Sequence, residues 1–186
     1  LSPDLVPARS MNGDMADLWV FGYGSLMWRP GFDHDEVFKA RLSGFHRSLC
    51  VLSHVHRGTP AKPGLVLGLD RGGSCVGLAF KVPAAARETA IDYLRARELV
   101  THVYKETIRS VRLETGKVVK AMTYVVDRNH LQYSGKLNVG QAAGLIVGAT
   151  GQSGPNVEYV ANTVAHLKTL GIRDRGLEEL VAAVSG

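Results

Sequence analysis

Apolar residues along this chain follow two different periods. Runs of β-branched, aromatic and leucine residues between turn residues predict strands, whereas apolar residues spaced i, i+3, i+4 and i+7 predict helices. The predicted strands cover residues 36–42, 45–52, 64–69, 75–82, 103–113 and 117–126. The predicted helices cover residues 83–100, 139–148, 157–170 and 177–184. The pattern therefore predicts a protein in which most strands precede most helices.

The predicted strands come in pairs that are separated by short glycine-containing segments. These segments are Ser43-Gly44, Asp70-Arg71-Gly72-Gly73 and Glu114-Thr115-Gly116. Because such residues favour tight turns, each pair is predicted to form a hairpin. Hairpins rather than alternating strands and helices indicate an α+β fold with an antiparallel or mixed sheet.

The chain contains no internal repeat and no linker-like segment, so residues 18–186 are predicted to form a single domain. Residues 1–10 resemble an expression-tag remnant with a protease site. We therefore expect residues 1–17 to be a tag remnant and disordered N-terminus, outside the fold.

The helix predicted at 83–100 carries a carboxylate on its apolar side. Ile91, Leu94 and Glu98 follow the i, i+3, i+7 spacing, so Glu98 continues the apolar stripe. An unpaired buried charge is unfavourable. Glu98 is therefore either paired with an arginine near the helix end, Arg95 or Arg97, or placed there for chemistry.

The apolar run at 19–21 ends in Gly22-Tyr23-Gly24-Ser25. This pattern predicts a strand that enters a backbone-lined loop, where two glycines allow positive φ angles and close approach of a ligand. Successive N–H groups and the serine hydroxyl could then hold a carboxylate or an oxyanion. The alternative is an ordinary tight turn. The third glycine of a dinucleotide fingerprint and the Gly-Lys-Thr/Ser of a phosphate loop are absent, so nucleotide binding is not expected.

Composition and charge exclude several classes of partner. The 186 residues are 45% hydrophobic, with 22 Lys and Arg against 17 Asp and Glu, which gives a net charge of +5. The basic residues form no run and do not alternate with aromatic residues, so no nucleic-acid partner is expected. No apolar run reaches the roughly 20 residues that span a bilayer, so no membrane partner is expected either.

The two cysteines, Cys50 and Cys75, lie within apolar strand-like segments. Buried free thiols in such positions behave as small hydrophobic side chains and fit a reducing compartment. The predicted location is therefore cytoplasmic.

The segment at 54–64 is rich in proline and glycine and predicts a loop with side chains that can contact an anion, including Arg57. His54 and His56 would project to the same side of an extended chain, which makes a metal site conceivable. Because no third ligand stands at a diagnostic spacing, we expect neither a metal nor another cofactor.

The stretch from Trp19 through Pro30 resembles the start of the ChaC family of γ-glutamylcyclotransferases, whose Val-Phe-Gly-Tyr-Gly-Ser-Leu segment grips a γ-glutamyl group. The Arg97-Glu98 pair resembles the family's catalytic pair, which implies that Glu98 is catalytic. The His-Arg-Gly-Thr-Pro loop, the Ala-Tyr-Val-like segment and the segment with Glu158 and Tyr159 are also similar to the family. The substrate-binding residues that the resemblance implies are Val20, Phe21, Gly22, Tyr23, Gly24, Ser25, Leu26, Arg57 and Tyr124.

The resemblance covers most of residues 19–171 and implies a γ-glutamylcyclotransferase-like small β-barrel with packed α-helices. It departs from the family at 99–104, where the Gly-Gly-Tyr of some relatives is absent. The implied reaction is degradation of glutathione to 5-oxoproline and Cys-Gly. Three alternatives stay open: a cyclotransferase for other γ-glutamyl compounds, a non-catalytic γ-glutamyl-binding regulator, and a structural or interaction protein.

Overall fold

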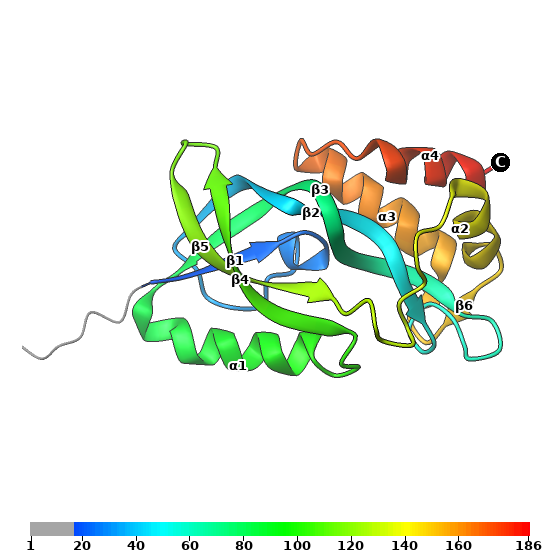
Figure 1. The fold of residues 1–186 in the computed structure, drawn as a ribbon, viewed down its shortest axis with the longest axis horizontal. Coiled ribbons are helices and arrows are strands. Elements are labelled where there is room, and N and C mark those ends of the chain that lie inside the picture. The colour runs from blue at the N-terminus through cyan, green and yellow to red at the C-terminus, as the bar shows by residue number, and fades with distance from the viewer. Residues whose placement is uncertain (1–16) are drawn as a thin grey trace, which may run out of the picture.

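A computed structural model describes residues 17–186, which form a closed five-stranded β-barrel with helices around it (Figure 1). The predicted tag remnant, apart from its last residue, lies outside the described residues. The strand order around the barrel is β1-β3-β2-β4-β5. The strands are β1 Leu18–Gly22, β2 Glu36–Ser53, β3 Gly64–Val82, β4 Tyr104–Leu113 and β5 Val118–Val126. The expectation of an α+β small-barrel fold is confirmed.

The helices lie in two places relative to the barrel. Helix α1, Arg87–Glu98, runs along one side, whereas α2, α3 and α4 pack together at the opposite end (Figure 1). These three are Val139–Ile146, Asn156–Thr169 and Arg175–Val184. Short elements complete the fold: the 3-10 helices η1 Ser25–Met27 and η2 Ala84–Ala86, and the two-residue strands β6 Thr150–Gly151 and β7 Gly154–Pro155. All four predicted helices are present, with ends shifted by a few residues.

The largest difference from the sequence prediction concerns β2 and β3. Each is one long strand, so the prediction of two short hairpins across 36–52 and 64–82 is wrong. The two strands pair antiparallel from Glu36 with Lys81 to Ser53 with Gly64, and the connection between them is the loop at 54–63. The two segments predicted as turns, 43–44 and 70–73, instead lie opposite each other within the paired β2 and β3 strands, where the register shifts after Ser43.

Glycines explain why the ribbon continues through these segments. Gly44 has φ 92°, and Gly72 and Gly73 have φ 104° and 64°. Positive φ at an irregularity bends and twists a strand without ending its pairing, as in a β-bulge. The glycines therefore curve the long ribbon so that it can close into the barrel.

Strand β1 is buried on both faces, which is why its sequence is a continuous apolar run. Val20 packs into the cluster between the barrel and the helices, and Phe21 packs into the cluster inside the barrel. β1 pairs antiparallel with β3 and parallel with β5. The loop that follows β1 is thereby held at the barrel mouth.

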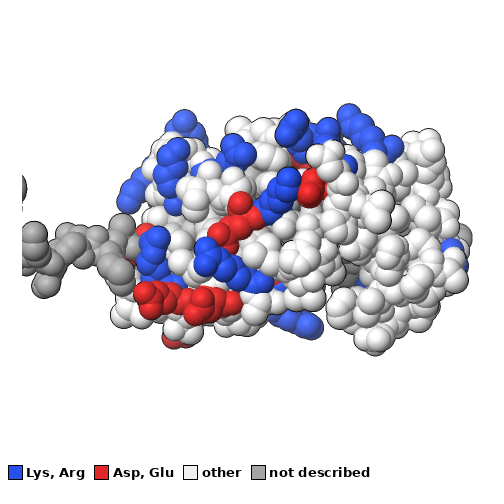
Figure 2. All heavy atoms as spheres, turned by 60° about the horizontal axis from the view of Figure 1, so that its bottom comes forward, with Lys and Arg blue, Asp and Glu red and all other residues white. Residues whose placement is uncertain are grey.

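The described surface carries charges of both signs. On the face shown in Figure 2, Lys and Arg side chains are interspersed with Asp and Glu rather than gathered in one stripe. No helix in residues 17–186 is long and apolar enough to cross a membrane.

Candidate active site

The loop after β1 turns directly into the 3-10 helix η1. Gly24 precedes that helix with φ −136°, and neither Gly22 nor Gly24 has a positive φ, so that part of the sequence prediction is wrong. Close packing is what favours glycine here. A Cβ atom at Gly22 would lie 3.1 Å from Leu26 Cβ, and one at Gly24 would lie 3.3 Å from Leu67 Cδ1.

The start of η1 leaves backbone donors available. The first N–H groups of a helix have no acceptor within the helix, and no side chain caps η1. Ser25 is exposed and adds its hydroxyl at the same place. The loop therefore offers several donors to an anionic group.

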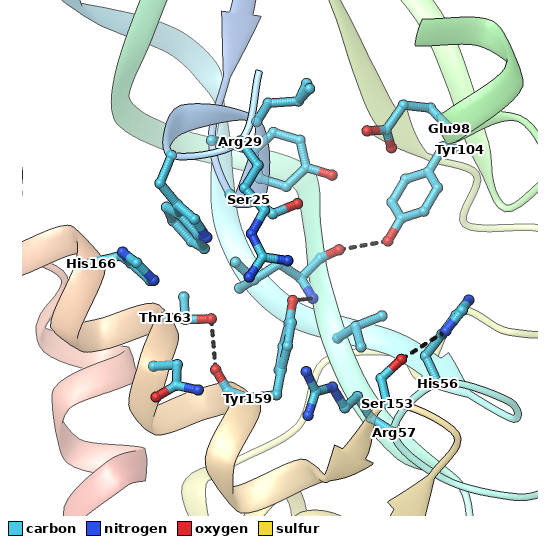
Figure 3. Close-up of a pocket in the computed structure, with 17 residues that line it drawn as sticks. Ser25, Arg29, His56, Arg57, Glu98, Tyr104, Ser153, Tyr159, Thr163 and His166 are labelled. Atoms are coloured by element: carbon cyan, nitrogen blue, oxygen red, sulfur yellow. Dashed lines mark hydrogen bonds between the residues drawn. The ribbon is translucent and has the colours of Figure 1, made fainter. Parts of the chain in front are cut away.

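This loop forms one wall of a cavity of about 360 Å³, shown in Figure 3. The cavity gathers side chains from the loop after β1, the end of α1, the loop at 54–63, the start of β4, and α3. Its lining residues are Tyr23, Gly24, Ser25, Leu26, Trp28, Arg29, His56, Arg57, Val66, Leu67, Glu98, Tyr104, Ser153, Tyr159, Asn162, Thr163 and His166.

Glu98, the last residue of α1, supplies the acidic group of the cavity (Figure 3). Its side chain is only 17% exposed, and Ala90 and Leu94 of the same helix face are fully buried. Burial raises the pKa of Glu98 above its ordinary value of 4.5, and the charge of Arg97, which acts in the opposite direction, does not cancel this effect. A carboxyl group with a raised pKa is suited to take up and return a proton near neutral pH.

Arg97 joins the end of α1 to the loop. Its guanidinium donates to the Ser25 hydroxyl over 2.7 Å and to the Arg29 carbonyl over 2.7 Å. Its Nε lies 3.6 Å from Glu98 Oε1. Arg97 therefore fixes Glu98 and the loop relative to each other. The two alternatives for Glu98 are both present, because its carboxylate pairs with Arg97 and also lines the cavity.

Two tyrosines in the cavity wall bind the backbone of Leu67 in β3. The Tyr104 hydroxyl donates to the Leu67 carbonyl over 2.6 Å, and the Leu67 N–H donates to the Tyr159 hydroxyl over 3.0 Å. Asn156 binds both backbone groups of Leu65 in the same way, over 2.8 Å each. Side chains thus satisfy the edge of β3 where β1 no longer pairs with it. Burial raises the pKa of Tyr159 to about 12 and also raises that of Tyr104, so both hydroxyls stay protonated.

The loop at 54–63 reaches the cavity because it docks on the turn between β6 and β7. Backbone bonds run from Gln152 N–H to the Val55 carbonyl and from Ser153 N–H to the His56 carbonyl. The Arg57 guanidinium lies 5.3 Å from the centre of the Tyr159 ring and donates to the Pro155 carbonyl over 3.3 Å. Arg57 therefore presents a positive charge at the cavity wall.

The structure gathers some of the predicted site residues and separates others. Tyr23, Gly24, Ser25, Leu26, Arg57 and Glu98 line the cavity together. Val20, Phe21 and Gly22 lie in the buried part of β1 below it. Tyr124 lies outside the lining, and its hydroxyl donates to Glu106 Oε1 over 3.0 Å. Tyr159, noted in the sequence only for its similarity to the family, is part of the wall.

Other lining residues carry no local sequence signal that marks them. Trp28 stacks on His166 of α3 with ring centres 4.3 Å apart, although the two are far apart in the chain. Tyr104 begins β4 and reads as an ordinary strand aromatic. Within residues 17–186, no group of three or more His, Cys, Asp or Glu side chains could hold a metal ion.

The fold and this cavity define a class of protein: a small closed barrel in which one buried carboxylate faces a backbone-lined loop. The family model described as ChaC-like protein matches residues 18–186. The chain therefore belongs to the ChaC-like family.

Named relatives share most of the chain. It is 34% identical over 171 residues to the glutathione-specific γ-glutamylcyclotransferase of Escherichia coli, covering 92% of this chain and 74% of that protein. It is 32% identical to the human glutathione-specific γ-glutamylcyclotransferase 1, covering 93% and 81%. The crystal structure of a yeast γ-glutamyl cyclotransferase specific to glutathione has the same fold, with a TM-score of 0.79 at 23% identity, covering 91% and 96%.

Proposed function

We propose that this protein is a γ-glutamylcyclotransferase that degrades glutathione to 5-oxoproline and Cys-Gly, with Glu98 as the general base and acid. The observation that carries the proposal is the buried carboxylate of Glu98 in the same cavity as the Tyr23–Leu26 loop. The named relatives, which are described as specific to glutathione, support the choice of substrate.

The reaction needs one proton relay and no further reactant. The α-amino nitrogen of the glutamyl group attacks its own γ-carbonyl carbon, forming the C–N bond of the five-membered ring. This nitrogen changes from an ammonium group to the ring N–H and loses two protons, while the departing amide nitrogen gains two and becomes the ammonium group of Cys-Gly as the original C–N bond breaks. Glu98 accepts these protons one at a time from the first nitrogen and gives them to the second. Atoms and electrons balance, because the products together have the composition of the substrate.

Positioning is expected to contribute more than proton transfer. Holding nitrogen and carbonyl in an ideal geometry can lower the barrier by about 7–11 kcal/mol. General acid–base catalysis contributes about 10²–10⁴-fold in rate. In this proposal the loop donors and Arg57 hold the glutamyl carboxylate and the reacting carbonyl, which leaves Glu98 to move the proton.

A second cavity could hold Cys-Gly, the part of the substrate that leaves. It has a volume of about 270 Å³ and shares His56, Val66, Glu98 and Tyr104 with the first. Glu98 must reach both the attacking and the departing nitrogen, so it belongs at the boundary between the two parts of the substrate. The glutamyl group would then occupy the loop side, and Cys-Gly would extend into the second cavity, which includes the apolar residues Val55, Val100 and Val103.

The test is an assay of purified protein with glutathione, with 5-oxoproline and Cys-Gly both quantified. We expect equal amounts of the two products. Parallel assays with γ-glutamyl amino acids and γ-glutamyl amines test the broader cyclotransferase: comparable turnover of these would contradict specificity for glutathione. Binding of glutathione by calorimetry without any 5-oxoproline would instead indicate a non-catalytic γ-glutamyl-binding protein.

We also place the protein in the cytoplasm and without a cofactor. Cys50 and Cys75 are both buried and free, which suits a reducing compartment. Glutathione is the only small molecule that this reaction requires. Fractionation of the source cells with an antibody against the protein would test its location.

A further inference from the structure

Arg47 of β2 is a buried arginine that the proposed reaction does not use. Its side chain is only 4% exposed. It donates to three acceptors: Nε to the Tyr23 carbonyl over 2.6 Å, Nη2 to the Val76 carbonyl over 2.7 Å, and Nη1 to Asp174 Oδ2 over 3.3 Å. A buried guanidinium with two carbonyls and one carboxylate around it is held in a single orientation.

These acceptors lie where β1 leaves the sheet. The pairing of β1 with β3 ends at Gly22 opposite Leu78, and Tyr23 is the next residue along the chain. Arg47 therefore bridges the departing chain and β3 at the first position where backbone pairing stops. It fastens the base of the loop that lines the cavity.

The orientation of the Tyr23 carbonyl also sets the direction of the Gly24 N–H. Every peptide bond of residues 17–186 is trans, so the Tyr23 carbonyl and the Gly24 N–H point in opposite directions from one peptide plane. Arg47 holds that carbonyl toward the body of the protein, and Tyr23 and Gly24 both line the cavity. The Gly24 N–H is thereby turned away from Arg47.

We propose that Arg47 is a positioning residue that holds the Tyr23–Gly24 peptide so that the Gly24 N–H is presented to the γ-glutamyl group. This proposal rests on the proposed function for the identity of the ligand. Glycine suits the position because a side chain there would come within 3.3 Å of Leu67.

Asp174 extends this role to the last helix. Its Oδ2 pairs with Arg47, and its Oδ1 accepts from the Leu177 N–H over 3.1 Å, which caps α4. The same carboxylate thus holds both the helix start and the guanidinium. Loss of its charge would loosen Arg47 while an amide could still cap the helix.

The first experiment compares crystal structures and kinetics of the wild type, Arg47→Met and Arg47→Lys. We expect the Tyr23–Gly24 peptide to rotate in Arg47→Met, and KM for glutathione to rise by roughly 10- to 100-fold, the size of one hydrogen bond to a charged group. The kcat value should change less, and the acid limb of the pH profile should stay in place, because Glu98 lies on another element. Arg47→Lys keeps the charge but lacks the planar fork, so it should fold and give a smaller rise in KM.

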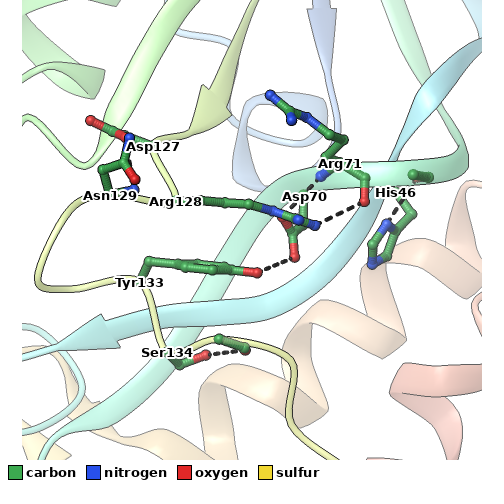
Figure 4. A network of polar contacts seen from close by, with 10 residues as sticks. His46, Asp70, Arg71, Asp127, Arg128, Asn129, Tyr133 and Ser134 are labelled. Atoms are coloured by element: carbon green, nitrogen blue, oxygen red, sulfur yellow. Dashed lines mark hydrogen bonds and ion pairs between the residues drawn. The ribbon is translucent and has the colours of Figure 1, made fainter.

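The chain offers a control in a second ion pair that has one buried member. Asp70 of β3 is 2% exposed and accepts from Arg128 Nε over 2.7 Å and from the Tyr133 hydroxyl over 2.8 Å (Figure 4). Neither Asp70 nor Arg128 lines the cavity. Asp174→Asn and Asp70→Asn therefore make the same change in two ion pairs, and only the first should raise KM.

An unchanged Tyr23–Gly24 peptide in Arg47→Met would overturn the proposal. So would equal KM values for Asp174→Asn and Asp70→Asn at a matched loss of thermal stability, because Arg47 would then be structural only. If Arg47→Met does not fold, the comparison of KM between Asp174→Asn and Asp70→Asn decides the proposal. Wild-type protein that forms no 5-oxoproline would overturn the proposed function instead, while the peptide orientation would still decide the role of Arg47.

Discussion

The Arg97 guanidinium donates a hydrogen bond to the Ser25 hydroxyl over 2.7 Å. This bond joins the last turn of α1 to the loop after β1, two elements that are far apart in the sequence. Because Arg97 also lies beside Glu98, one side chain affects both the position of the loop and the pKa of the proposed base. Changes at this junction should therefore alter both ligand binding and proton transfer.

The pH dependence should follow Glu98. Burial raises the pKa of this carboxyl above 4.5, so kcat/KM should fall with decreasing pH at a midpoint above 4.5. Arg97 lowers the pKa, so Arg97→Met should move that midpoint to still higher pH and also reduce kcat. Arg95→Met is the control, because Arg95 pairs with Glu106 and lies outside the cavity. A midpoint in Arg97→Met at or below the wild-type value would contradict the assignment.

Glu98→Gln should fold and bind glutathione but lose about 10²–10⁴-fold in kcat. The amide preserves size and hydrogen bonding, yet it cannot accept the proton of the substrate ammonium group. The loss should therefore appear in kcat rather than in KM. Glu88→Gln, an exposed change in the first turn of the same helix, should retain activity. Formation of 5-oxoproline within a few-fold of wild type would show that Glu98 is structural.

The same substitution should stabilise the protein at neutral pH. A carboxyl group whose pKa is raised on folding stabilises the fold in its protonated form, and this contribution is lost as pH rises through the folded-state pKa. The introduced amide has no charge to desolvate, so Glu98→Gln should exceed the wild type in free energy of unfolding at pH 7. The difference should vanish below pH 4.5, the ordinary pKa of the group. Urea unfolding at several pH values measures this, and a pH-independent difference would argue against a desolvated carboxylate.

Gly24→Val should abolish binding of a γ-glutamyl ligand while the protein stays folded. The reason is close approach rather than a positive φ, since the added Cβ would lie 3.3 Å from Leu67 and its methyl groups would enter the cavity. Calorimetry on the Glu98→Gln background measures affinity without turnover. A matched control is Gly144→Val, where a Cβ has no neighbour within 4 Å. Unchanged affinity in Gly24→Val would remove the loop from the binding site.

Turnover should not depend on a metal ion. His54 and His56 have no third ligand at a diagnostic spacing in the sequence. Dialysis against a chelator should leave kcat and KM unchanged. Loss of activity that one divalent metal restores would contradict this prediction.

Local sequence patterns correctly predicted the features that depend only on residues close together in the sequence. The i, i+3, i+7 stripe placed Glu98 on the buried side of its helix, and α1 has this arrangement. The helix predicted to end at residue 170 is α3, which ends at Thr169 with Leu170 as its cap, and Gly171 follows with φ 70°. Such features follow from backbone geometry within a few residues, so the sequence alone contains them.

The glycine segments were harder to interpret, because a glycine with positive φ can either end a strand in a turn or bend a strand that continues. Gly44, Gly72 and Gly73 do have positive φ angles, but they bend one long ribbon instead of ending four short strands. Whether a strand reverses or continues depends on the partner it pairs with, and that partner is remote in sequence. The same limit applies to Gly22 and Gly24, where packing against Leu26 and Leu67 decides the need for glycine.

By itself, the sequence determined the helices, the strand-rich first half, the loop after β1 and the acidic residue that faces it. Only the tertiary structure decided which distant residues complete the cavity. His166 reaches it from α3, where its ring stacks on Trp28. Tyr104 and Tyr159 reach it because the edge of β3 is open at Leu67, where side chains rather than a strand satisfy the backbone. Arg47 reaches the Tyr23 carbonyl for the same reason. Buried polar groups must find partners wherever the closed chain places them, and a linear pattern does not record that placement.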